Sequence, residues 1–557
     1  MVILATACLV ILGLRSLQVQ GIDGAKYASY GQAEQFQSVA LPAMRGTLYD
    51  RTGDVLAISV PRVDIVADDL QVRDPASTAP ALARALGLPE ATILSKLSGR
   101  SQYVPLAIEV GTAEQKKVEA LNLPYLAYVP DTQREDPVGH LFDPLLGLVG
   151  WDGRGLSGIE YQYNKVLSGK AGKEDVAVGA MGDQLPGGAK NVTPANQGEG
   201  LVLSLDQPLQ YEVTKALTAQ VLAQKAASGS VIVLDTKTGG ILSMVNLVRS
   251  GASVRPAQQN LALTAVYQPG SVMKLATIAG GLQDHLISPS SNFTVPYQIT
   301  LGGWPFQDAE PHGTEQLDVS QILAQSSNVG TIEIAHLLGE ERLYHYLRDL
   351  GFGTASGLGW PGESAGLLGS PATWSGSSMG SVPIGTGEAV TAMQIVDAYN
   401  AVANGGVFVP PHTVEGLVGA SGKEHLVQPA ARHRVLDQST VEELVPMLED
   451  VTSGGTGTAA QIPGYQIAGK TGTAQIPSAT GPGYEPGAWM ATFVGFVPAG
   501  NPQITAIVVL DHPASMYGGS AAAPVFSTIM KYALRHFDIS PSGASSLPGT
   551  SNSSTRP

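Results

Sequence analysis

Three short segments, far apart in the chain, carry side chains that together could perform acyl transfer through a serine. In the first, Lys274 follows Ser271 by three residues, and apolar residues continue behind them at helical spacing. Residues three apart on a helix are neighbours, so the lysine amine can reach the serine oxygen. Burial would lower the pKa of this amine towards that of a working base. The spacing predicts a nucleophile at Ser271 and a general base at Lys274, whereas taken alone Ser271 reads as a helix N-cap.

The second segment places Ser326 and Asn328 two residues apart in a polar stretch. The hydroxyl is suited to relaying a proton, and the amide is suited to holding a substrate carbonyl. An ordinary Ser/Asn turn is the alternative when the segment is taken alone.

The third segment is Lys470, Thr471, Gly472 and Thr473, preceded by apolar residues. On a strand at the edge of a sheet, its backbone would pair with a substrate peptide, and the amine and hydroxyls would meet the peptide's carboxylate. Gly472 would allow close backbone approach. The order of the three segments, with a long stretch before the third, argues against coincidence.

Composition narrows the class of protein. The chain has 557 residues, of which 43% are hydrophobic and 14% charged, and its formal net charge is −15. It is therefore long enough for two or more folded units, and it lacks the basic character that nucleic-acid binding needs. The single cysteine, Cys8, excludes an intramolecular disulfide and a Cys/His zinc cluster.

The expected elements divide the chain in two. Residues 17–195 predict a mixed α+β region with a hairpin over 45–57 and a helical pattern from Pro80 to Leu97, ending in a Gly/Pro-rich linker over 185–200. Residues 196–538 predict one α+β domain whose antiparallel sheet is built from both ends of the segment. Its expected strands and helices are a helix after Asp206, strands 230–234, 241–245, 492–497 and 504–510, and a helix over 523–537.

Both ends of the chain have distinctive compositions. Residues 1–16 hold an apolar run that ends at Arg15 and is shorter than the roughly 20 residues a membrane span needs. Because no basic residue precedes the run, we expect a membrane anchor that begins upstream, with a signal-peptide core, a buried helix or lipid attachment at Cys8 as alternatives. Residues 539–557 are rich in Ser, Gly, Pro and Thr, which predicts disorder.

Ser-x-x-Lys, Ser-x-Asn and Lys-Thr-Gly in this order are similar to the signature of serine β-lactamases and penicillin-binding proteins. Over nearly its whole length the chain resembles the class B penicillin-binding proteins, which are monofunctional peptidoglycan D,D-transpeptidases. The resemblance implies an anchor, an elongated pedestal that can dimerise, and a transpeptidase domain outside the membrane. The stretches that carry it, besides the three motifs, are Arg45-Gly46-Thr47, Tyr49-Asp50-Arg51, Gly155 to Glu160, Gly385 to Glu388 and Ala403 to Gly406.

The resemblance also implies a mechanism. Ser271 would attack the D-Ala-D-Ala carbonyl of a stem peptide while Lys274 takes its proton, and an amine of a neighbouring stem would resolve the acyl-enzyme. Ser326 and Asn328 would relay protons and orient the substrate. The oxyanion would lie between the backbone N–H groups of Ser271 and Thr473. No metal or organic cofactor is implied, and β-lactams would acylate the same serine.

The implied setting is a single-pass membrane protein that works beside a glycan-strand polymerase, with a division role preferred to elongation. Ser327, where lactamases have Asp, favours a penicillin-binding protein. A hydrolase on the same scaffold, either a β-lactamase or a D,D-carboxypeptidase, remains an alternative in which Glu333 or Glu363 would activate water. So does a penicillin sensor or catalytically idle scaffold. We expect no Ser-His-Asp triad at His312, and Trp489 and Tyr517 could line the cleft or the core.

Overall fold

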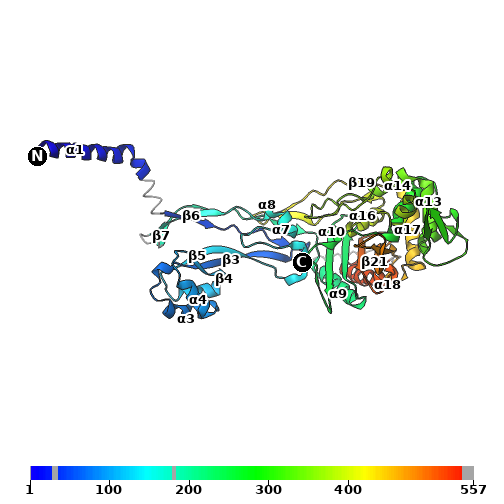
Figure 1. The fold of residues 1–557 in the computed structure, drawn as a ribbon, viewed down its shortest axis with the longest axis horizontal. Helices are drawn as coiled ribbons and strands as arrows, with labels where there is room; N and C mark the ends of the chain where they lie inside the picture. Colours follow the sequence, from blue (N-terminus) through cyan, green and yellow to red (C-terminus); the bar gives the residue numbers. More distant parts are fainter. Residues whose placement is uncertain (1, 28–35, 179–183, 542–557) are drawn as a thin grey trace, which may run out of the picture.

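The computed structural model describes residues 2–27, 36–178 and 184–541. The body of the molecule is elongated (Figure 1). Long strands form one end, and helices packed around a sheet form the other. We call the part from β1 (Phe36–Leu41) to β8 (Gly200–Leu203) the pedestal, and the part that follows the catalytic part.

The catalytic part is organised by a six-stranded antiparallel sheet that combines strands from both ends of its sequence, as predicted. Nearly every residue of β9 is buried, because helices cover both faces, and this explains the unbroken run Val-Ile-Val-Leu within it. The edge strand β20 carries Lys470 to Thr473. In spatial order the strands are β11 (Ser253–Pro256), β10 (Ile241–Ser250), β9 (Ser228–Asp235), β22 (Ile504–Asp511), β21 (Tyr484–Val497) and β20 (Ala468–Pro477).

Two terminal helices cover one face of this sheet. The helix α9 (Gln207–Ala223) begins where predicted, because the Asp206 carboxylate accepts a hydrogen bond from the Leu209 N–H at 3.0 Å. The last helix, α19 (Ala523–His536), packs beside it, and its His536 Nε2 lies 2.9 Å from Asp206 Oδ1. Residues of both helices form one hydrophobic cluster with the sheet.

The opposite face is covered by helices from the middle of the sequence, which form the larger core. The central one, α11, is buried along nearly its whole length, and its first residue is Lys274. A short 3₁₀ turn over Gly270–Met273 precedes it, so the helix expected near Ser271 begins as that turn. The main helices of this layer are α11 (Lys274–Gln283), α12 (Val319–Gln325), α13 (Asn328–Leu338), α16 (Ala392–Ala403) and α17 (Gln438–Ser453).

The pedestal is built from long strands. The predicted hairpin is confirmed as β2 (Leu48–Tyr49) and β3 (Val55–Ala67), and β3 also pairs with β4 (Val104–Val110) and β5 (Leu126–Glu135). At the far end of these strands two helices pack together (Figure 1).

The helical pattern from Pro80 to Leu97 is confirmed as two helices, α3 (Pro75–Leu86) and α4 (Glu90–Leu97), because Gly87 ends the first in a left-handed conformation.

The predicted linker over 185–200 was wrong. Most of it is the strand β7 (Gln184–Thr193), which pairs with β6 (Gly172–Val178). Its Gly/Pro-rich composition suggested a loop, whereas long-range pairing decides its conformation.

A mixed sheet connects the pedestal to the catalytic part. The strand β8 pairs in parallel with β2 of the pedestal and antiparallel with β17 (Val414–Val418) of the catalytic part. Backbone hydrogen bonds therefore run from one part into the other.

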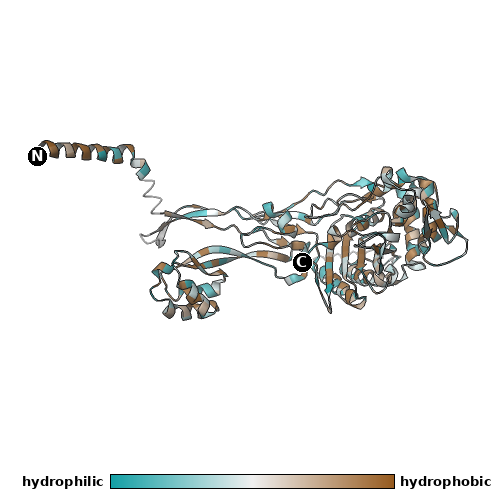
Figure 2. Ribbon diagram, in the orientation of Figure 1, coloured by the Kyte–Doolittle hydropathy of each residue, from teal (hydrophilic) through white to brown (hydrophobic). Residues whose placement is uncertain are grey.

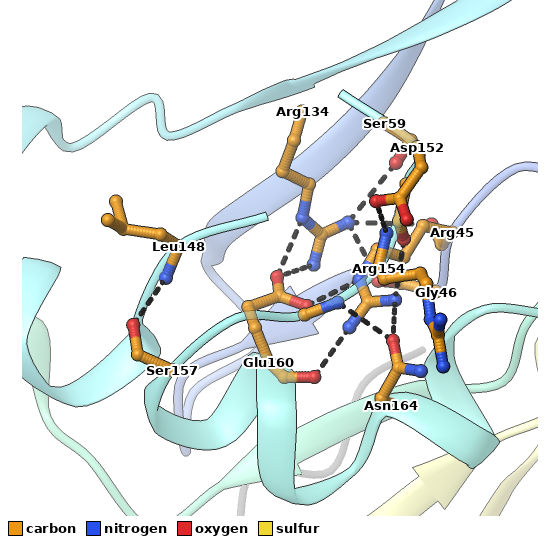
Figure 3. Close-up of polar contacts among 12 residues, drawn as sticks. Arg45, Gly46, Ser59, Arg134, Leu148, Asp152, Arg154, Ser157, Glu160 and Asn164 are labelled. Atoms are coloured by element: carbon orange, nitrogen blue, oxygen red, sulfur yellow. Dashed lines mark hydrogen bonds and ion pairs between the residues drawn. The ribbon is translucent and has the colours of Figure 1, made fainter. Parts of the chain in front are cut away.

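Beside this junction lies a buried ion cluster (Figure 3). Glu160 is 2% exposed, and its Oε2 lies 2.5 Å from Arg45 Nε while its Oε1 lies 2.8 Å from Arg134 Nε. Arg45 also donates to Asn164 Oδ1 at 2.8 Å, and Arg134 donates to the Gly46 carbonyl at 2.8 Å. One carboxylate thus joins three segments of the pedestal.

The N-terminal helix extends further than the predicted anchor over 1–16. The helix α1 (Val2–Leu17) continues through Gln18–Ile22, and Ile3–Ile22 is long and apolar enough to cross a membrane. Figure 2 shows how strongly apolar α1 is. Most of the tail predicted to be disordered, residues 542–557, lies outside the described residues.

Candidate active site

The three predicted segments meet at a cleft of about 860 Å³ beside the edge strand β20. Ser271 lines it together with Ser326 and Asn328 on one side and Thr471 and Thr473 on the other. Trp489 and Tyr517 also line it, which settles where these two aromatic residues lie.

Ser271 lies in a tight turn that packs against β20. Gly270, before it, has φ +60°, and a Cβ there would lie 2.6 Å from the Thr473 carbonyl oxygen. Gly385 crosses the same turn, and a Cβ on it would lie 2.2 Å from the Gly270 carbonyl oxygen. Side chains are excluded at both positions, so glycine allows the backbone around Ser271 to approach that of Thr473.

The Lys274 side chain is fully buried, and its amine points at the second segment. It donates to Asn328 Oδ1 at 2.8 Å, to the Ser326 carbonyl at 2.5 Å and to Ser326 Oγ at 3.2 Å. Burial, reinforced by the charge of Lys470, holds the pKa of Lys274 well below its usual range. Among the described residues no hydrogen bond joins Ser271 to this amine, so their direct contact stays a prediction.

Lys470 reaches the same hydroxyl from the other side. Its fully buried amine donates to Ser326 Oγ at 2.9 Å and to the Thr471 carbonyl at 3.2 Å. Burial lowers the pKa of Lys470 to about 7. The Ser326 oxygen therefore lies between two buried amines whose pKa values are both lowered, an arrangement that can pass a proton between them.

The rest of the Lys-Thr-Gly segment has more than one role. Thr471 Oγ1 lies 2.7 Å from Thr456 Oγ1, and Thr473 Oγ1 accepts from the Gly518 N–H at 3.3 Å. A Cβ on Gly472 would lie 3.0 Å from the Pro269 carbonyl oxygen. The glycine therefore lets the strand pack on the turn that carries Ser271, whereas the sequence predicted that it would allow close approach of a substrate.

The turn between α12 and α13 presents Ser326 in a conformation that is uncommon outside glycine. Ser326 has φ +65° and ends α12. Ser327 begins the next helix, because its hydroxyl accepts from the Gly330 N–H at 2.9 Å. Ser327 is therefore buried, whereas Ser326 and Asn328 on either side of it line the cleft.

Sequence reasoning missed Asp308, which lies against this turn. Its carboxylate accepts from the Ser327 hydroxyl at 2.8 Å and from the Asn328 N–H at 2.5 Å. No motif or spacing marks an aspartate that binds a helix N-terminus twenty residues later. This contact could therefore be found only in the structure.

The alternatives considered from sequence find less support. Neither Glu333 nor Glu363 belongs to the described residues that line the cleft, and Glu363 accepts from the Ser356 N–H at 2.7 Å. His312 does pair with an aspartate, Asp308, but not in a triad with Ser271. The described residues hold no group of three or more His, Cys, Asp and Glu side chains placed to bind a metal ion.

Ser271 lines a cleft in which a second hydroxyl, that of Ser326, lies between two buried amines of lowered pKa, beside the edge strand of an antiparallel sheet. This arrangement is typical of serine enzymes of the acyl-transfer class. Family models identify which one. Residues 229–531 match the penicillin binding protein transpeptidase domain, and residues 40–203 match the penicillin-binding protein dimerisation domain. The chain belongs to the penicillin-binding protein transpeptidase family.

Similar proteins match along most of this chain. Penicillin-binding protein PbpB of Mycolicibacterium smegmatis is 32% identical over 96% of this chain and 89% of its own length. The probable peptidoglycan D,D-transpeptidase PenA of Neisseria gonorrhoeae is 32% identical over 96% and 91%. Among solved structures, penicillin binding protein 3 of Mycobacterium tuberculosis complexed with aztreonam covers 92% of this chain and 100% of its own, with 28% identity and a TM-score of 0.72. The class B resemblance seen in the sequence is thereby confirmed.

Proposed function

We propose that this protein is a peptidoglycan D,D-transpeptidase that cross-links stem peptides through an acyl-enzyme on Ser271. The observation that carries the proposal is the Ser326 hydroxyl, held 2.9 Å from Lys470 Nζ and 3.2 Å from Lys274 Nζ at the wall of the cleft. Such a chain of exchangeable protons serves a reaction that needs a base first and an acid afterwards.

Acylation begins with proton transfer. Neutral Lys274 takes the Ser271 proton as the oxygen attacks the carbonyl carbon of the penultimate D-Ala. The N–H groups of Ser271 and Thr473 stabilise the oxyanion. When the intermediate collapses, the C–N bond breaks, and the terminal D-Ala leaves as an amine after taking a proton through Ser326.

Deacylation transfers the stem to an amine. The amine of a second stem attacks the ester carbonyl, gives up a proton to the same relay and releases Ser271. A hydrolase would need a base for water, and in the described part of the chain the carboxylates that line the cleft are Asp308 and Glu310. Asp308 is occupied by the Ser327 hydroxyl and the Asn328 N–H, which favours transfer over hydrolysis.

Penicillins and related β-lactams acylate the same serine in this proposal, since they resemble the D-Ala-D-Ala end. One relative, penicillin binding protein 3 of Mycobacterium tuberculosis, is crystallised both with aztreonam and with ampicillin, which supports it. The 20-residue helix Ile3–Ile22 anchors the protein by a single pass, with the rest outside the membrane. A glycan-strand polymerase and division proteins are the proposed partners. The relative FtsI of Escherichia coli, 30% identical, is named a peptidoglycan D,D-transpeptidase, which supports the cross-linking activity.

An exchange assay tests the transfer itself. The protein is incubated with a peptide ending in D-Ala-D-Ala and a labelled D-amino acid as acceptor. We expect the label to replace the terminal D-Ala in wild type and not in Ser271→Ala. Release of D-Ala without incorporation of the label would instead establish a carboxypeptidase.

A further inference from the structure

We propose that Asp308 is a positioning residue for the acyl transfer proposed above, and that its charge, balanced by His312, tunes the base that activates Ser271. Asp308 lies outside all three sequence motifs. The inference rests on the proposed function of Lys274.

Asp308 is hydrogen-bonded to the turn that carries Ser326 and Asn328. The carboxylate is buried, being 7% exposed as a residue, and lies at the N-terminus of α13. Its Oδ1 accepts from the Asn328 N–H at 2.5 Å and from the Val329 N–H at 3.0 Å, and its Oδ2 accepts from the Ser327 hydroxyl at 2.8 Å. An anion in this place is stabilised by the helix N-terminus.

The residue before Asp308 also binds this turn. The Gln307 carbonyl accepts from Asn328 Nδ2 at 2.8 Å, so two consecutive residues hold the backbone and side chain of Asn328. The other end of that amide, Oδ1, is an acceptor for Lys274. A shift of Asp308 would therefore move the groups that orient the Lys274 amine.

Charge connects Asp308 to the base as well. Burial and the charge of Lys470 lower the pKa of Lys274, whereas the negative charge of Asp308 opposes them. Removing that negative charge lowers the pKa of Lys274 further, so the amine becomes neutral at a lower pH.

His312 moderates this effect. Its Nε2 lies 3.1 Å from Asp308 Oδ2, and its Nδ1 faces the Gly313 carbonyl at 2.5 Å and Glu315 Oε2 at 4.0 Å, with the Tyr297 ring packed edge-on. Burial opposes protonation, but these partners outweigh it and raise the pKa of His312. A protonated His312 compensates part of the charge of Asp308.

The experiment follows acylation of the full chain by a labelled penicillin as a function of pH. In Asp308→Asn we expect the plateau rate to fall between about ten- and a hundred-fold, as for a misplaced catalytic group, and the acid limb to move to lower pH. In His312→Asn we expect the opposite shift, to higher pH.

The matched control is Asp318→Asn. Asp318 caps α12 in the same way, accepting from the Gln321 N–H at 2.7 Å, but lies outside the cleft lining. Because asparagine also caps helices, this variant should leave the melting temperature nearly unchanged, and it should change neither the rate nor its pH dependence.

Several results would overturn the inference. One is an acylation rate in Asp308→Asn equal to that of the wild type. Another is a slower rate in Asp308→Asn whose acid limb lies at the same pH as in the wild type. If Asp308→Asn fails to fold, an unmoved acid limb in His312→Asn overturns it instead. Failure of the proposed function looks different: the wild-type protein would then form no adduct, or would release D-Ala without incorporating the label in the exchange assay.

Discussion

Two lysine amines share one hydroxyl oxygen in this cleft, and their surroundings give them different tasks. Lys274 is bound by the Ser326 and Asn328 acceptors, while Lys470 is bound by Ser326 and Thr471 on the edge strand. Both pKa values are lowered mainly by burial. The first amine therefore suits the role of base. The second lies on the strand that we propose meets the substrate carboxylate, and it suits binding and relay.

The pH dependence of acylation follows from Lys274. The base works when neutral, so the rate rises as pH rises through the pKa of Lys274. Because that pKa is well below the value of about 10.4 for an ordinary lysine, the rate should reach its plateau at a lower pH than an ordinary lysine would allow. Stopped-flow acylation by a fluorescent penicillin measures this. A rate that keeps rising into the range of ordinary lysines would contradict the assignment.

Replacing the base tests the same residue. In Lys274→Arg we expect acylation to slow by about a hundred-fold or more, because a guanidinium stays protonated. The control is Lys215→Arg on α9, where the lysine side chain is 64% exposed. A loss of only a few-fold in Lys274→Arg would exclude this lysine as the base.

The residues that do the proposed chemistry could be found from sequence, but those that hold them could not. Ser271, Lys274, Ser326 and Lys470 form short motifs with helical or strand spacing. The structure places Ser271 and Ser326 in the cleft lining and the two buried amines against Ser326. Asp308 acts on a helix that begins twenty residues later, through a loop contact that no local pattern records.

At the scale of elements, the turn that carries Ser271 packs tightly between Gly385 and β20, and this packing fixes the position of the Ser271 backbone. In Gly385→Ala we expect acylation to fall and the free energy of unfolding to drop by about 2 kcal/mol more than in the control, since the new Cβ would clash with the Gly270 carbonyl. The control is Gly357→Ala, which has a similarly positive φ but no atom within 4 Å of its Cβ. Equal effects in the two variants, measured by denaturant unfolding and acylation, would refute the argument.

Some of these helices and strands could be predicted from local sequence, and others could not. The two-ended sheet and α9 were predicted because apolar periodicity and the Asp206 cap are local signals. The strand β7 was missed because its backbone is paired by β6, while its own residues are typical of a loop. The division at residue 195 stays a prediction, since β8 pairs with both parts.

At the scale of the whole molecule, the ion cluster around Glu160 holds the pedestal together beside the junction. In Glu160→Gln we expect a loss of about 3 kcal/mol in the stability of the pedestal, because Arg45 and Arg134 are left buried without their carboxylate. Acylation of the catalytic part should change little. Thermal unfolding and limited proteolysis measure the effect.

The control for this prediction is Glu212→Gln, which removes an exposed pair with Lys215 and should cost about 1 kcal/mol or less. Equal losses in the two variants would mean that the cluster contributes no more than a surface ion pair.

The most direct test of the central claim is the intact mass of the protein after incubation with a labelled penicillin, for wild type, Ser271→Ala and the exposed-serine control Ser290→Ala. We predict one long-lived adduct on wild type and on Ser290→Ala, and none on Ser271→Ala. An adduct that persists in Ser271→Ala, or penicillin that is consumed without any adduct, would contradict Ser271 as the nucleophile of a transpeptidase.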